Sequence, residues 1–385
     1  MIRRIIEKEL RLSASEYPVV TLIGPRQSGK TTLAKMVFPD HEYVNLEQPE
    51  YRLLAQEDPK SFFHRFRPPC ILDEIQNVPQ LLSWIQVMVD EDPERKGLFI
   101  LTGSHQLSLR EAIGQSLAGR TSLLTLLPFS LRELPAQLQD RPREELLFSG
   151  FMPRLHDQKI RPGRFYRDYY QTYVERDVRK LIALENQQAF ELLMRLLAGR
   201  VGQELNYSQL AGQVGISAPQ VKRWIGVLEA SFILFKLPPY YKNYGKRLTK
   251  SPKIYFTEPG LAVYLLGIEA SEQLERDRAF GGLFENLVIL EALKERYNKG
   301  KEGWLYFYRD NHQHEVDLLF PVGSDYIPVE IKSSRTYHSH FLKGIEYFRK
   351  LSKCESPGLL LYDGDLETDS VDGKIRNFRK GFKGL

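Results

Sequence analysis

A predicted phosphate-binding loop constrains the fold of this chain more than any other stretch. Residues 24–31 fit the pattern G-x-x-x-x-G-K-[ST], after an apolar run at residues 19–23 and before a helix-like segment at residues 32–38. Glycines let the backbone fold around phosphate groups, and backbone N–H groups at a helix N-terminus attract their charge. The predicted nucleotide-binding residues are Gly24, Pro25, Arg26, Gln27, Ser28, Gly29, Lys30, Thr31 and Thr32. A glycine-rich turn of purely structural use is the alternative, which the flanking strand and helix disfavour.

Two side chains of this loop have specific expected tasks. Lys30 would reach the β- and γ-phosphates, and the hydroxyl of Thr31 would complete the coordination of Mg²⁺. We therefore expect ATP and Mg²⁺ as cofactors, although the pattern does not separate ATP from GTP.

Length and composition limit the class of protein. A chain of 385 residues is too long for one ordinary core and suggests two or three domains. An apolar fraction of 42% and a charged fraction of 27% are typical of a soluble globular protein. No apolar run is long enough to span a membrane, and the N-terminus lacks a signal-like apolar region. Cys70 and Cys354 have no metal-ligand spacing, so we expect a cytoplasmic protein with ordinary thiols and no membrane partner.

Two carboxylates follow the next predicted buried strand, at residues 70–76. A parallel strand delivers the residues at its carboxyl end to the same crevice as the phosphate loop. Nucleotide hydrolysis needs one carboxylate near Mg²⁺ and another that polarises the attacking water. Asp73 and Glu74 are the candidates for these two roles, with a solvated turn as the alternative.

A further strand at residues 98–104 ends in small polar residues. Ser104 or Thr102 would bond the γ-phosphate or position water, unless this is a plain turn. Arg120 could serve as an arginine finger, in the same chain or from a neighbouring subunit of a homo-oligomer, or could be an ordinary surface arginine.

These pieces resemble the AAA+-like ATPases of the P-loop superfamily. They are more closely similar to a prokaryotic family of two-part ATPases with a C-terminal domain of unknown function. The likeness rests on the phosphate loop, on residues 72–76, 102–104 and 117–120, and on the connector at residues 150–153. The resemblance implies an α/β fold with a parallel sheet at residues 1–130 and ATP hydrolysis.

The following segment, residues 131–185, is predicted to be a lid or connector. Its tyrosines at positions 166, 169, 170 and 173 have helical spacing, which is typical of packing rather than of chemistry.

Residues 186–270 have the pattern of a winged helix-turn-helix. Asn206 and Ser217 are placed to cap two helices that Gly215 separates, and two strand-like runs follow. Six cations and no carboxylate lie between Ser231 and Thr257, namely Lys236, Lys242, Lys246, Arg247, Lys250 and Lys253. We predict DNA contacts at Gln220, Lys222, Arg223, Lys242, Lys246 and Arg247. The alternative is a packing module or a protein-docking module.

Residues 271–385 are similar to the PD-(D/E)xK nuclease superfamily in residue spacing and in the predicted order helix, three strands, helix, strand. Strand alternation places Glu330 and Lys332 on one face. The predicted metal ligands here are Glu285, Asp317 and Glu330, and Lys332 would stabilise developing phosphate charge. The basic stretch at residues 374–380 could add phosphate contacts or be a solvated tail.

Two functions remain open from the sequence. In the first, ATP hydrolysis drives or gates a winged helix and a Mg²⁺-dependent nuclease-like domain on DNA. In the second, the chain is a regulatory ATP switch whose C-terminal domains bind proteins without cutting DNA.

Overall fold

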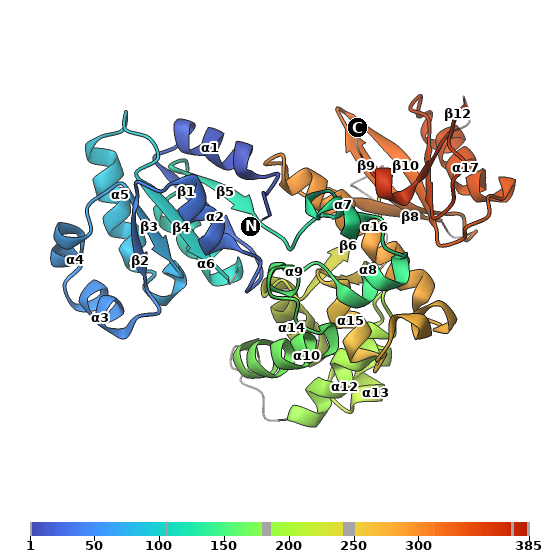
Figure 1. Cartoon of the computed structure of the whole chain (residues 1–385), viewed down its shortest axis with the longest axis horizontal. Helices are drawn as coiled ribbons and strands as arrows, with labels where there is room; N and C mark the ends of the chain where they lie inside the picture. The colour runs from blue at the N-terminus through green and yellow to red at the C-terminus, as the bar shows by residue number, and fades with distance from the viewer. Residues whose placement is uncertain are drawn as a thin grey trace.

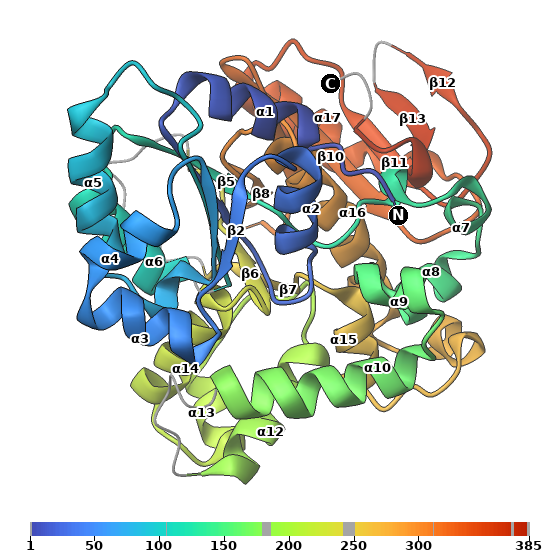
Figure 2. The same cartoon turned by 60° about the vertical axis from the view of Figure 1, so that its left-hand side comes forward.

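The computed structural model describes residues 2–104, 106–178, 186–241, 251–310, 312–370 and 373–382. The chain forms an N-terminal sheet with helices on both faces, a connector, a three-helix unit and a second sheet at the C-terminal end (Figure 1). Figure 2 shows the same arrangement from a view in which helix α10 lies along the three-helix unit.

The N-terminal sheet has five strands in the order β2-β3-β4-β1-β5, and every pairing is parallel. Its strands are β1 (Val19–Ile23), β2 (Glu42–Asn45), β3 (Cys70–Asp73), β4 (Phe99–Gly103) and β5 (Thr121–Thr125). Its helices are α1 (Glu7–Glu16), α2 (Lys30–Val37), α3 (Pro49–Glu57), α4 (Pro59–Arg65), α5 (Leu81–Glu91) and α6 (Gln106–Ser116), with a 3₁₀ turn η1 (Ile75–Asn77). The predicted α/β fold with a parallel sheet is confirmed.

Successive strand residues pack on opposite faces of this sheet. Val20 and Leu22 face a core with α1 and α2, while Val19 and Ile23 face the core on the other side. Because both faces are covered, β1 and β4 are buried along their whole length.

The connector is helical throughout the described residues. It contains η2 (Leu131–Glu133), α7 (Ala136–Gln139), α8 (Arg143–Ser149), α9 (Pro153–Gln158), α10 (Pro162–Tyr169) and the π-helix η3 (Tyr170–Val178). The predicted packing role of the tyrosines is confirmed, because all four are buried.

The three-helix unit contains α12 (Gln187–Ala198), α13 (Tyr207–Val214) and α14 (Ala218–Ala230), followed by β6 (Leu234–Leu237), β7 (Lys253–Phe256) and α15 (Pro259–Leu265). Both predicted caps are confirmed, because Asn206 accepts from the N–H of Gln209 and Ser217 accepts from that of Gln220.

The C-terminal sheet has the order β12-β13-β11-β10-β9-β8. Its strands are β8 (Tyr306–Arg309), β9 (Glu315–Val322), β10 (Asp325–Lys332), β11 (Leu359–Tyr362), β12 (Thr368–Asp369) and β13 (Lys374–Asn377). The helices beside it are η4 (Ser271–Arg276), α16 (Phe280–Tyr297), η5 (Ser339–Leu342), α17 (Lys343–Ser352) and η6 (Phe378–Lys380).

The prediction of a solvated basic tail at residues 374–380 is wrong. This stretch pairs with β11 as β13 and continues into η6. Arg376 binds Asp369, and Arg379 donates to Asp363 at 2.8 Å. Acidic partners therefore neutralise part of the charge that the sequence suggested was available for phosphates.

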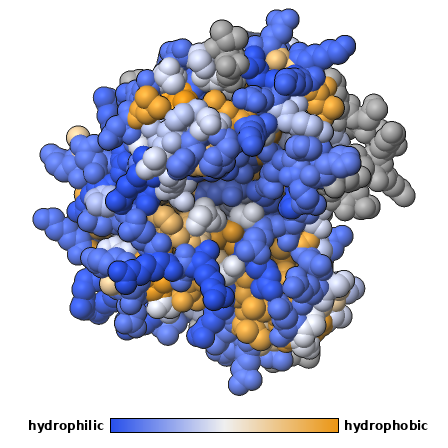
Figure 3. Space-filling model, turned by 90° about the vertical axis from the view of Figure 1, so that its right-hand side faces the viewer, coloured by the Kyte–Doolittle hydropathy of each residue, from blue (hydrophilic) through white to orange (hydrophobic). Residues whose placement is uncertain are grey.

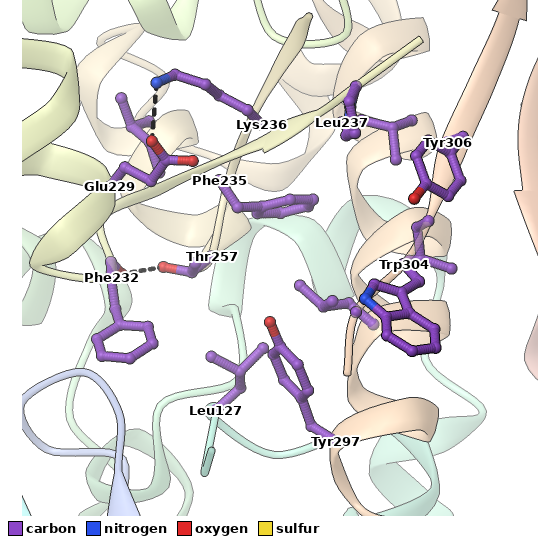
Figure 4. A pocket seen from close by; sticks show the side chains of 15 residues that line it. Leu127, Glu229, Phe232, Phe235, Lys236, Leu237, Thr257, Tyr297, Trp304 and Tyr306 are labelled. Atoms are coloured by element: carbon purple, nitrogen blue, oxygen red, sulfur yellow. Dashed lines mark hydrogen bonds and ion pairs between the residues drawn. The ribbon is translucent and has the colours of Figure 1, made fainter. Parts of the chain in front are cut away.

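The three-helix unit is joined to the C-terminal sheet through the backbone. The N–H of Tyr240 donates to the Phe307 carbonyl at 2.7 Å, and the N–H of Phe307 donates to the Pro238 carbonyl at 3.1 Å. A cavity of about 260 Å³ lies at this junction, between β6, the end of α16 and Leu127 after the N-terminal sheet (Figure 4). The three parts of the chain therefore meet in one place.

The surface on the C-terminal side is largely hydrophilic, with apolar residues in smaller areas (Figure 3). No helix in the described part of the chain is both long enough and apolar enough to cross a membrane.

Candidate functional site

The phosphate-binding loop lies between β1 and α2, at the carboxyl edge of the N-terminal sheet. A Cβ on Gly24 would lie 2.1 Å from the carbonyl oxygen of Leu126, so only glycine fits there. Gly29 has a φ of 92° at the start of α2, a left-handed conformation that favours glycine. The glycines of the pattern thus serve both the curvature of the loop and its packing.

Lys30 lies inside this loop. Its Nζ donates to the carbonyl oxygens of Gly24 at 3.0 Å and Pro25 at 2.9 Å. Burial lowers the pKa of the Lys30 ammonium to about 8, although the negative charges of Glu74 and Asp73 oppose this shift. A polyphosphate would supply the negative charge that a buried ammonium lacks.

Asp73 ends β3 and accepts three hydroxyl groups. Thr31 Oγ1 lies 2.9 Å from Asp73 Oδ1, Tyr43 donates to Oδ2 at 2.8 Å, and Thr102 donates to Oδ1. The hydroxyl of Thr31 and the carboxylate of Asp73 are hard oxygen donors of the kind that Mg²⁺ prefers. The predicted pair therefore lies together, and Tyr43 is an additional partner that we did not predict.

Glu74 lies immediately beyond the strand, with a left-handed φ of 58°. Its Oε2 accepts from Ser104 Oγ at 3.0 Å and from the side chain of Gln76, and its N–H donates to Thr102 Oγ1. Ser104 thus orients the carboxylate, as a residue between two nucleotide elements would. We gave Gln76 no role, although its position two residues after Glu74 is a signal that could have found it.

Arg120 is not placed to act on the nucleotide of its own chain. It precedes β5, whose first residue pairs with Val19, whereas the phosphate loop follows Ile23 at the other end of β1. Four residue steps along a strand separate these edges by about 13 Å. Its guanidinium binds Asp90 through two bonds of 2.6 and 2.8 Å. The prediction of a finger acting in the same chain is therefore wrong, and only a role toward another subunit stays open.

Two other arginines contact the loop. Arg26 binds Glu47 at 3.2 Å, and its guanidinium lies 5.6 Å from the ring centre of Tyr173 in η3. Arg4 is buried and donates to the Ser28 carbonyl at 2.8 Å. It also forms a buried ion pair with Glu133 at 3.0 Å. No local pattern in the sequence pointed to Arg4, because its partners lie far away along the chain.

A small cavity of about 50 Å³ adjoins the start of α2. It is lined by Ile2, Arg4, Gly29, Thr32, Leu33, Met36, Phe129, Pro153 and Asp157. The predicted residue Thr32 thus faces a largely apolar space that could accept the edge of a flat base.

The C-terminal sheet carries a second cluster of charged side chains. Lys332 Nζ lies 2.7 Å from Glu330 Oε1 and 3.4 Å from Asp317 Oδ2, which also accepts the N–H of Ile331. Burial, followed by the charge of Asp317, raises the pKa of Glu330 to about 8 although the charge of Lys332 opposes it. The three predicted residues therefore come together on one face of β9 and β10.

Glu285 is held differently from these residues. It accepts from Lys253 Nζ at 2.9 Å and from Tyr255 at 2.6 Å, both on β7 of the three-helix unit. Burial raises the pKa of Glu285, and the charge of Lys253 opposes this. Across the described ranges, no three His, Cys, Asp or Glu side chains are arranged to hold a metal ion.

The predicted DNA-binding residues fall into three groups. Gln220, Lys222 and Arg223 are exposed on α14. Lys242, Lys246 and Arg247 lie outside the described residues. Lys253, which we counted among the cations of the wing, is buried and ion-paired, so that prediction is wrong.

Comparison with known proteins identifies three domains along the chain. The models that match are an AAA domain at residues 16–135, a domain of unknown function (DUF8612) at residues 141–272 and a domain of unknown function (DUF4143) at residues 280–377. Uncharacterized protein Rv2008c of Mycobacterium tuberculosis is 30% identical over 338 residues, covering 87% of this chain and 74% of the relative. Uncharacterized protein Mb2031c of Mycobacterium bovis gives the same values.

Solved structures are more distant. A Walker-type ATPase of Pyrococcus abyssi is 15% identical with a TM-score of 0.43, over 68% of this chain and 94% of that chain. DnaA from Aquifex aeolicus, bound to AMPPCP, is 14% identical with a TM-score of 0.27, over 58% of this chain and 86% of that chain.

Proposed function

The chain belongs to the family of AAA-type proteins with a C-terminal domain of unknown function that includes the mycobacterial protein Rv2008c, and we propose that it couples ATP hydrolysis to an event on DNA. The observation that carries the ATPase part is the meeting of Lys30, Thr31, Asp73, Glu74 and Ser104 at one edge of a parallel sheet. These residues come from three separate strand ends, as a hydrolysis site requires.

Each of these side chains has one task in the proposed reaction. The backbone of the loop and Lys30 bind the β- and γ-phosphates. Thr31 and Asp73 would hold Mg²⁺, which neutralises charge on the phosphates when it is bound. Glu74, oriented by Ser104 and Gln76, accepts a hydrogen bond from the attacking water and polarises it.

The proposed contact with DNA rests on residues 186–270 as a winged helix-turn-helix. The order of α12, α13, α14, β6 and β7 supports this assignment, as do the exposed polar residues at the start of α14. Lys222 and Arg223 would bind phosphates, which gives affinity without base specificity.

The proposed nuclease-like domain covers residues 271–385. Asp317, Glu330 and Lys332 support it, since a carboxylate from each of two neighbouring strands faces a lysine. The buried Oε2 of Glu330 has no hydrogen-bond partner among the described residues, which suits a carboxylate that binds a divalent cation.

We expect the protein to nick plasmid DNA with Mg²⁺ or Mn²⁺ and ATP, and we expect Lys332→Ala and Asp317→Ala to reduce nicking by about 100-fold or more. Each variant removes a group that would contact the cation or the phosphate. Agarose gels of supercoiled plasmid measure the rate. Matched controls are Lys343→Ala and Asp325→Ala, both at exposed positions of the same domain. Equal nicking by all variants, or none by the wild type, would rule out this activity.

The second candidate function is a regulatory ATP switch without nuclease activity. It is favoured by the ion pairs from β7 that hold Glu285 and Glu315. In that case the C-terminal domains bind proteins, and the acidic cluster is structural.

Binding to duplex and single-stranded DNA across a salt series separates the two functions. DNA contact predicts that affinity falls steeply as salt rises, and that Lys222→Ala lowers the slope of log K against log salt by about 1. Fluorescence anisotropy measures both quantities, with Lys96→Ala on the N-terminal part as the control. Affinity that is independent of salt would favour the protein-binding switch.

A further inference from the structure

Lys253 brings a cation from the three-helix unit into the acidic cluster of the C-terminal sheet. Its side chain is only 5% exposed, and its Nζ lies 2.9 Å from Glu285 Oε1 and 2.6 Å from Glu315 Oε1. Tyr255, two residues further along the same face of β7, donates to Glu285 at 2.6 Å. One strand therefore supplies two groups to carboxylates of another part of the chain.

The surroundings keep this lysine charged. Burial lowers the pKa of an ammonium, but the charges of Glu285, Asp317 and Glu315 outweigh it and raise the pKa of Lys253. An ammonium is a compact charge with three donors, so it can neutralise two carboxylates at once. A divalent cation would neutralise the same carboxylates through oxygen coordination.

Glu330 provides a second and independent observation. Its side chain is 8% exposed overall, and its Oε2 is buried without a hydrogen-bond partner in the described part of the chain. Its other oxygen accepts Lys332, which also contacts Asp317. One buried carboxylate oxygen of the cluster therefore lacks the donor or cation that such an atom requires.

We propose that Lys253 is an internal counter-ion that takes the place of a divalent cation in this cluster and must leave before the cation binds. This inference rests on the proposed nuclease-like site. It explains why Glu285 is not grouped with Asp317 and Glu330 as a metal site: its carboxylate is bound to β7.

The arrangement gives the three-helix unit control over the cluster. Lys253 and Tyr255 belong to β7, whereas Glu285 and Glu315 belong to α16 and β9. A shift of β7 away from the C-terminal sheet frees both carboxylates together. Any event that moves this strand then also opens the cluster to a cation.

The test measures binding of Mn²⁺ alone to nucleotide-free full-length protein, by electron paramagnetic resonance of free Mn²⁺. All variants carry Asp73→Asn, so that the N-terminal site does not contribute. Lys253→Met is expected to bind Mn²⁺ about tenfold more tightly than its parent, because the competing charge is gone. Lys236→Met is the matched control, since Lys236 lies on the neighbouring strand and is paired only with Glu229 among the ion pairs of the described residues. Adding Glu330→Gln to Lys253→Met is expected to reverse the gain.

Removing a buried lysine could also unfold the protein, and thermal unfolding followed by circular dichroism covers that outcome. If Lys253→Met is unfolded in EDTA, the proposal requires that millimolar Mn²⁺ restores the fold. A folded Lys253→Met with unchanged or weaker Mn²⁺ affinity overturns the proposal, and so does an unfolded one that Mn²⁺ does not restore. Absence of DNA cleavage in every variant would instead refute the nuclease function, because the Mn²⁺ measurement does not depend on cleavage.

Discussion

Glu74→Gln is expected to lower ATP turnover by about 100- to 10,000-fold while nucleotide binding is retained. Glutamine has nearly the same shape and can still bond Ser104 and Gln76, so the loop and the edge of the sheet should keep their structure. It cannot accept a proton or polarise water as a carboxylate does. Phosphate release measures turnover, and fluorescence of a labelled ATP analogue measures affinity.

Glu94→Gln is the matched control for this variant. Glu94 is exposed in the loop before β4, at the edge of the sheet opposite the nucleotide site. Normal turnover in Glu74→Gln would show that another group activates the water and that our assignment of Glu74 is wrong.

Lys30→Ala is expected to weaken ATP binding by about 10- to 100-fold, because hydrogen bonds between charged groups are worth about 1.5–3 kcal/mol. The ammonium is buried and bound only to the carbonyl oxygens of Gly24 and Pro25, so a phosphate would be its main ionic partner. Isothermal titration with ATP and Mg²⁺ measures the affinity. Lys96→Ala, exposed at the opposite edge of the sheet, should bind ATP as the wild type does. Unchanged affinity in Lys30→Ala would argue against the phosphate-binding role of the loop.

Much of the nucleotide site could be predicted because its residues follow local rules. The glycines, Lys30 and Thr31 belong to one continuous pattern, and the position of Asp73 follows from the end of an apolar strand. The sheet then brings these segments together, since parallel strands share their carboxyl edge.

The residues that we missed are those whose partners lie far away in the sequence. Arg4 reaches Glu133, and Tyr43 reaches Asp73 from a strand that otherwise reads as ordinary. The strand β5 was also not predicted, because the helical and polar signals before it drew attention to Arg120. No periodicity encodes such contacts, and only the tertiary structure defines them.

Charge was the least reliable guide. Lys253 and the stretch at residues 374–380 look in sequence like cations available to DNA, yet Lys253 is buried on Glu285 and Arg379 is bound to Asp363. A count of lysines and arginines does not record how many of them a fold has already neutralised. The distribution of acidic residues across distant strands decides that.

The central claim is that the edge of the N-terminal sheet is a working hydrolysis site, and direct release of phosphate from ATP tests it most simply. We predict that the wild-type protein releases phosphate, that EDTA stops the reaction, and that Lys30→Ala and Glu74→Gln both fall to the background rate. Release by the wild type that does not exceed the rate of these two variants would contradict the claim.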